Sequence, residues 1–124
     1  MECMAVIKRR SGDIIIEPLG ITASISEATR NWQLSHHGVS LLAVVRTRYK
    51  KEVTEVLSQD FSGRGHLAVV KRSDDDFCLE VLGPGKDMLS ASRNWMLQHF
   101  TGAVNLIAIL KGEYLQEVFD ALSN

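Results

Sequence analysis

The sequence repeats itself, because the tripeptide Arg30-Asn31-Trp32 recurs as Arg93-Asn94-Trp95, 63 residues further along the chain (93 − 30 = 63). After His99 the second copy contains two extra residues, and the offset becomes 65. Further identities at these two offsets include Ala5/Ala68, Lys8/Lys71, Glu17/Glu80, Leu19/Leu82, His36/His99, Ala43/Ala108, Tyr49/Tyr114 and Leu57/Leu122. We interpret the chain as an internal duplication, with residues 1–62 as the first copy and 63–124 as the second.

The length of each copy predicts how the two copies fold together. A domain of about 60 residues buries only about 60% of the surface that its unfolded chain exposes, so one copy alone would be marginally stable. We therefore expect the two copies to share one core and to form a single pseudo-symmetric domain.

Each copy is predicted to have the order strand, strand, helix, strand, helix. Short runs rich in β-branched residues, separated by turn residues, predict strands, and apolar residues spaced three or four apart predict helices. The elements expected are strands 4–10, 13–19 and 39–45 with helices from Ser24 and Arg48, and strands 66–72, 76–82 and 104–110 with helices 87–100 and 113–122.

The first helix of each copy has the clearest local signals. Ser24 followed by Glu27 is a capping box, and Asp87 is the expected N-cap of the equivalent helix. Ile25, Ala28 and Trp32 form one apolar stripe, so the tryptophan is predicted to lie in the core and not on a ligand-binding surface.

This order of elements predicts an α+β fold, arranged as a two-layer sandwich. Residues 39–110 contain the order βαββαβ of ferredoxin-like folds. A pseudo-dimer whose copies exchange strands fits the same pattern, and the sequence does not decide between them. Because Pro18 lacks an N–H group, its strand should end there or run along a sheet edge.

Composition excludes several classes of protein. The 124 residues carry 14 basic and 15 acidic side chains, a net charge of −1, which is no global signature of nucleic-acid or membrane binding. No apolar run approaches the ~20 residues that a membrane-spanning helix needs. The two cysteines and the lack of a signal peptide predict a reducing, cytoplasmic setting.

No catalytic or metal-binding pattern is present, so we expect no cofactor and favour a binding protein over an enzyme. The chain has no G-x-S-x-G nucleophile motif and no supported cysteine–histidine pair. His36, His37 and His99 lack metal-ligand spacing and are predicted to cap helix C-termini. Glu17 and Glu80 follow hydrophobic triplets at strand ends, and the period-2 pattern predicts that they face solvent.

Two groups of residues are candidate binding sites. Arg30 and Leu34, with their repeats Arg93 and Leu97, lie on the sides of their helices away from the tryptophans, where they could contact another protein, the other copy or a second chain. The basic residues beside the two hairpin turns and those after the first buried strand could contact phosphates if they converge. The hairpin residues are Lys8, Arg9, Arg10, Lys71 and Arg72, and the others are Arg46, Arg48, Lys50 and Lys51.

The leading functional hypothesis is a small, non-enzymatic, intracellular module with pseudo-two-fold symmetry that binds a protein partner or itself. The first alternative is a nucleic-acid-binding regulator that uses the basic hairpin ends. The second is a small-molecule sensor with a pocket between the repeats.

Overall fold

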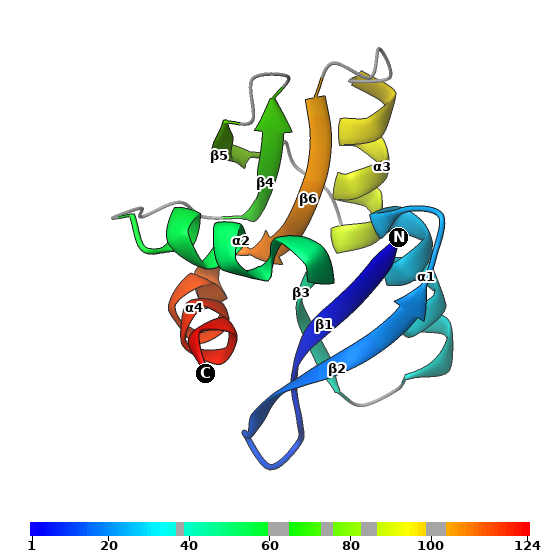
Figure 1. The fold of residues 1–124 in the computed structure, drawn as a ribbon. Coiled ribbons are helices and arrows are strands. Elements are labelled where there is room, and N and C mark those ends of the chain that lie inside the picture. Colours follow the sequence, from blue (N-terminus) through cyan, green and yellow to red (C-terminus); the bar gives the residue numbers. More distant parts are fainter. Residues whose placement is uncertain (37–38, 60–64, 73–75, 83–86, 99–103) are drawn as a thin grey trace.

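The computed structural model of the chain describes residues 1–36, 39–59, 65–72, 76–82, 87–98 and 104–124 (Figure 1). The first half contains β1 (Glu2–Lys8), β2 (Ile14–Ile21), α1 (Ile25–Ser35), β3 (Ser40–Arg46), the 3-10 turn η1 (Thr47–Tyr49) and α2 (Lys50–Leu57). The second contains β4 (His66–Arg72), β5 (Phe77–Val81), α3 (Met88–Gln98), β6 (Val104–Lys111), η2 (Gly112–Tyr114) and α4 (Leu115–Ser123). The predicted α+β class is confirmed.

The described strands form one six-stranded sheet in the order β2-β1-β3-β6-β4-β5, and every neighbouring pair is antiparallel. Each half contributes three adjacent strands. The halves meet where β3 pairs with β6, with Ala43 opposite Leu110, Val44 opposite Ile109 and Val45 opposite Ala108. The two halves therefore do not exchange strands, which was one of the alternatives that the sequence left open.

The central strands are buried on both faces, which explains their nearly continuous apolar sequences. Val44 and Val45 of β3, like Ile107 and Ile109 of β6, have no solvent exposure. The buried strands predicted over 39–45 and 104–110 are confirmed, displaced by at most one residue. β2 runs through Pro18 to Ile21 and is an edge strand, as the proline predicts.

Helices cover both faces of the sheet, so the predicted two-layer arrangement is wrong. Alternate residues of each strand point to opposite faces, and each set of buried side chains packs against its own helices. One core contains Ile25 of α1 and Met88 of α3, and the other contains Val53 of α2 and Val118 of α4. The ferredoxin-like alternative fails for the same reason, because α2 and α3, the two helices of its βαββαβ segment, lie on opposite faces.

The two halves exchange helices but not strands. Helix α2 of the first half packs against β5 of the second, and α4 packs against β2. At the corresponding turns, the rings of Tyr49 and Phe77 lie 5.6 Å apart, and the Lys8 ammonium lies 5.6 Å from the ring centre of Tyr114. Each half therefore supplies a helix that covers the other half's edge strand.

Local signals position α1 and α3 as expected. The Ser24 hydroxyl accepts a hydrogen bond from the N–H of Glu27, and the Glu27 carboxylate accepts one from the N–H of Ala23. This is the predicted capping box, with the glutamate reaching one residue before the N-cap. The Asp87 carboxylate accepts from the N–H of Ser90. None of the described helices is long and apolar enough to cross a membrane.

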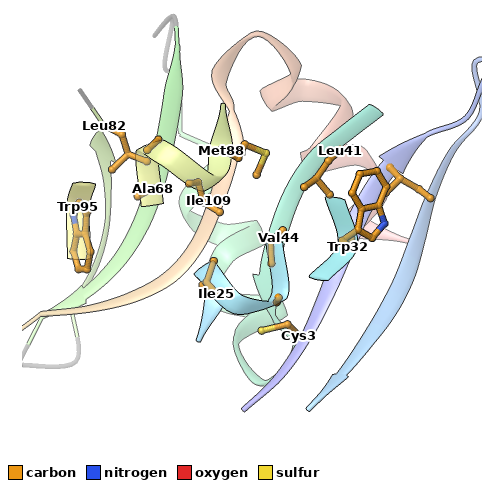
Figure 2. Packing of buried hydrophobic residues seen from close by; sticks show 14 of the residues in the cluster. Cys3, Ile25, Trp32, Leu41, Val44, Ala68, Leu82, Met88, Trp95 and Ile109 are labelled. Carbon is orange, nitrogen blue, oxygen red and sulfur yellow. The ribbon is translucent and has the colours of Figure 1, made fainter. Parts of the chain in front are cut away.

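Both tryptophans lie in the core, which confirms that prediction. Trp32 is 4% exposed and Trp95 is 5% exposed. Figure 2 shows them at the two ends of one buried cluster, with Ile25, Val44 and Met88 between them. This cluster contains residues from both halves.

We predict that the two halves unfold together, because each of the two cores joins residues from both halves. The variant Trp32→Phe leaves Trp95 as a fluorescent probe of the second half, and Trp95→Phe leaves Trp32 in the first. In each variant the denaturant midpoint from fluorescence should equal that from far-ultraviolet circular dichroism. Two separate midpoints in either variant would contradict a common unfolding unit.

Candidate functional site

The layer formed by α1 and α3 exposes large apolar side chains, whereas the layer formed by α2 and α4 exposes none. Leu34 is 68% exposed, Leu97 is 74% exposed and Met96 is 39% exposed. The other exposed large apolar residues in the described part of the chain are Met1, Ile21 and Val81, at the N-terminus and at the ends of the edge strands. Exposed apolar groups that cluster on one layer mark a candidate contact surface.

Charged side chains show the opposite distribution. The 22 residues of α1 and α3 include only Glu27, Arg30 and Arg93, whereas the 17 residues of α2 and α4 include six charged residues. Arg30 and Arg93 are exposed and form no ion pair with a described residue. The α1/α3 layer is therefore poor in charge, and both of its cations are available to a partner.

Small polar residues hold α1 and α3 together. Connected strands and helices alternate in direction, and because β3 and β6 are antiparallel, α1 and α3 are antiparallel as well. The hydroxyl oxygens of Ser26 and Ser92 lie 2.9 Å apart, and the Ser26 hydroxyl lies 3.1 Å from the sulfur of Met96. Thr29 and Ser92 are fully buried. This contact fixes the relative positions of the exposed side chains on the outer face.

The four predicted contact residues Arg30, Leu34, Arg93 and Leu97 all belong to the helices of this layer. All four are exposed, as expected for residues opposite the buried stripe that contains each tryptophan. Sequence reasoning missed Met96. The only available signal was the apolar pair Met96-Leu97 beside Trp95, because the first copy has Gln33 at the equivalent position.

A cleft of about 210 Å³ lies between α1 and the edge strand β2, and His36 partly fills it. The His36 ring stacks on Trp32, with ring centres 4.6 Å apart and planes inclined by 3°. Its Nε2 lies 3.2 Å from Oε1 of Glu17, and its Nδ1 lies 3.0 Å from the carbonyl oxygen of Trp32. His36 thus connects the end of α1 to β2.

These contacts confirm the capping role predicted for His36, because its ring reaches a carbonyl in the last turn of α1. They also correct the prediction that Glu17 faces solvent. Both faces of the sheet are covered, so the Glu17 side chain lies in the cleft and is 33% exposed. Both ring nitrogens of His36 already have hydrogen-bonding partners within the chain. His37 and His99 lie outside the described residues.

The second cleft, of about 300 Å³, lies between α3 and the other edge strand, β5. It contains the residues equivalent to those of the first cleft at the offset of 63: Glu80, Leu82, Ala91, Asn94 and Trp95. Leu97 and Val81 also line it. This cleft therefore adjoins both the exposed α1/α3 layer and the edge of the sheet.

The structure does not bring the basic hairpin ends together. Lys8 ends β1 and is followed by Arg9 and Arg10, whereas Lys71 and Arg72 end β4. β1 and β4 run in opposite directions. The two groups consequently lie at opposite ends of the sheet (Figure 1). Lys71 instead lies 5.3 Å from the ring centre of Tyr49.

Two other features were predicted from the sequence only in part, because the basic residues after the first buried strand were possible phosphate contacts but their surroundings were not foreseen. The Arg46 and Arg48 side chains lie 5.0 and 5.4 Å from the Tyr49 ring centre, so three cations surround this ring. Beside it, an open groove of about 710 Å³ runs between α2 and α4 and contains Arg48, Lys50 and Lys51. The basic run Arg46-Lys51 was the available sequence signal, but it did not show that α2 and α4 are adjacent.

Groups with displaced pKa values lie away from the α1/α3 outer surface. Burial raises the pKa of the Cys3 thiol, which is fully enclosed in the core. Burial, reinforced by the nearby charge of Lys111, lowers the pKa of His66 at the start of β4. The described residues include no group of three side chains that could hold a metal ion.

Comparison with known protein families, with curated proteins and with solved structures finds no match for this chain.

We predict that His36→Ala lowers the free energy of unfolding by about 1 kcal/mol, because it removes an aromatic contact of roughly 0.5–1.5 kcal/mol and a helix cap. In a Trp95→Phe background, the emission of Trp32 should also shift to longer wavelength as water reaches its ring. Asn31→Ala, on the exposed rim of the same cleft, is the control; because alanine favours the helix more than asparagine, it should not lower the free energy of unfolding, and it should leave the emission of Trp32 unchanged. Equal behaviour of the two variants would contradict the structural role of His36.

Proposed function

We propose that the chain is a non-enzymatic, intracellular protein-binding module and that a partner docks on the outer face of α1 and α3. One observation carries this proposal: the large apolar side chains exposed on described helices all lie on this layer. The opposite layer has the same number of helices and is covered by ordinary charged residues. Packing within the chain leaves Leu34, Met96 and Leu97 in solvent, so their burial by a partner would supply the favourable free energy.

The free energy available from burying these side chains, and the size of the face, are consistent with a small, specific protein–protein contact. Complete burial of a leucine or methionine side chain is worth about 1.5–3 kcal/mol. Each of the two helices is about 16 Å long, and packed helix axes lie about 8–10 Å apart. A face of this size matches the smaller, transient class of interfaces.

Arg30 and Arg93 define the chemistry of the preferred partner. Arginine is enriched at interfaces and forms bidentate hydrogen bonds with carboxylates. The two arginines stand at equivalent positions of the two copies, and each lies one helical turn before an exposed leucine. The partner we propose therefore carries acidic side chains that face the two central arginines, and apolar side chains that face Leu34 and Leu97 towards the two ends of the layer.

We also propose that the chain arose as an internal duplication and that both copies contribute to the binding face. Residues 1–62 and 63–124 would form a single pseudo-symmetric domain in which antiparallel α1 and α3 present two related half-sites. The mixed composition of both cores and the equivalent residues of the two clefts support this interpretation.

A second candidate function is the binding of an anionic ligand in the groove between α2 and α4. Its support is the presence of Arg48, Lys50 and Lys51 along one wall, with Phe119 and Leu122 also lining the groove. This groove lies between the two halves, where the sequence hypothesis placed a small-molecule pocket. Nucleic acid would be recognised here by the same cations and not by paired hairpin ends.

We predict that Leu34→Glu abolishes capture of the protein partner from host lysate treated with nuclease, because a carboxylate would be buried in an apolar part of the contact. Lys51→Glu introduces the same residue on the opposite layer and should leave capture unchanged. Binding that survives Leu34→Glu, weakens with salt and disappears in Lys51→Glu would instead support the anion-binding candidate. The measurement is quantitative mass spectrometry of the captured proteins, with the folded state of each variant checked by circular dichroism.

A further inference from the structure

The two edges of the sheet differ, although they are formed by equivalent strands. β2 and β5 are the edge strands, and each pairs with only one other described strand. An edge strand exposes a row of backbone N–H and C=O groups that can pair with another strand unless something blocks them.

The backbone groups that β5 presents to the outside can be identified from the register. The N–H of Leu82 donates to the carbonyl of His66, and the N–H of Arg72 donates to that of Asp76, so the even-numbered residues are hydrogen-bonded to β4. Hydrogen-bonded and non-hydrogen-bonded pairs alternate in antiparallel sheets. Phe77, Leu79 and Val81 therefore direct their backbone N–H and C=O groups away from β4.

The equivalent edge of the first half is blocked. Pro18 stands at the position of Val81 (81 − 63 = 18), and a proline has no N–H group to donate. The register shifts between Cys3 and Met4, and Gly20 has a φ of +75°, so this edge is also irregular. β5 contains no proline, and its pairing with β4 has no register shift.

We propose that β5 pairs with β5 of a second copy of this chain, in an antiparallel dimer whose two-fold axis passes through Leu79. This register places Leu79 opposite Leu79 of the partner subunit. Phe77 would lie opposite the partner's Val81, and Cys78 opposite the partner's Glu80. The two six-stranded sheets would then form one continuous sheet. The α1/α3 layer stays available, so this inference goes beyond the proposed function.

The side chains that would lie opposite each other across the two β5 strands favour a second copy of the chain as the partner. Each pair on one face is apolar, and an aromatic residue opposite a β-branched residue is a favourable cross-strand combination. The face with Cys78 and Glu80 brings no like charges into direct opposition. The 57% exposed side chain of Val81 would gain an aromatic neighbour. Because the β2 edge is blocked, such pairing ends at two copies and does not continue into a fibre.

Val81→Pro tests the proposal, because it removes the outward-facing N–H and leaves the β4 ladder intact. The first half already carries proline at this position, so the variant is expected to fold. Sedimentation from about 1 μM to about 1 mM should show a dimer of twice the 13.8 kDa chain mass for the wild type. Val81→Pro should raise the dimer Kd at least about tenfold, since two intermolecular hydrogen bonds are lost. Val81→Thr keeps the N–H and should leave the Kd nearly unchanged.

A disulfide experiment tests the register. In a Cys78→Ser background, Leu79→Cys should form a disulfide between subunits on oxidation, since Cα atoms of a hydrogen-bonded pair are about 5.5 Å apart. Val81→Cys should not cross-link to itself. A wild-type chain that stays monomeric throughout, or a dimer that Val81→Pro leaves intact, would overturn the proposal. Loss of the dimer in Leu34→Glu with no effect of Val81→Pro would also overturn it and assign self-association to the α1/α3 layer.

Discussion

The antiparallel pairing of β3 with β6 is the interaction on which the rest of the structure depends. It is made by a few residues of each half that are almost fully buried, among them Val44 and Ile109. Because the pair is antiparallel, the two halves have opposite orientations, and α1 and α3 meet side by side on one face. The two hairpin turns lie at opposite ends of the sheet because the halves have opposite orientations. Any surface shared by the halves must therefore lie on the helical layers or in the centre of the sheet.

The two helical layers differ in what they cover and in which side chains they expose. On one face α2 and α4 each cover the edge strand of the other half, and their outer surfaces carry the charges expected of a solvated layer. On the other face α1 and α3 are joined by small residues such as Ser26 and Ser92, and their outer surface keeps exposed leucines. Stability of the chain alone does not require Leu34 or Leu97 in solvent. The binding role that we propose would account for these exposed side chains.

The sequence predicted the order and class of the elements well, because periodicity, capping residues and turn residues act locally. Ser24, Asp87 and Pro18 each have the structural role that their chemistry indicates. The layer arrangement was missed because it depends on which face of the sheet each helix covers. The central strands are apolar at nearly every position, so their sequences do not alternate between polar and apolar residues and do not show which face a helix covers.

The candidate site was predicted in part. Leu34 and Leu97 follow from helical geometry, whereas the contact of His36 with Glu17 depends on a long-range approach of α1 to β2.

We propose that the partner binds to the outer face of α1 and α3. The most direct measurement places a photo-cross-linking amino acid at position 34 in the host cell and, separately, at position 116 on the exposed side of α4. Position 34 should give a discrete cross-linked product with another protein, and position 116 should give none. Products of equal yield from both positions, or a product from position 116 alone, would contradict the assignment of this face.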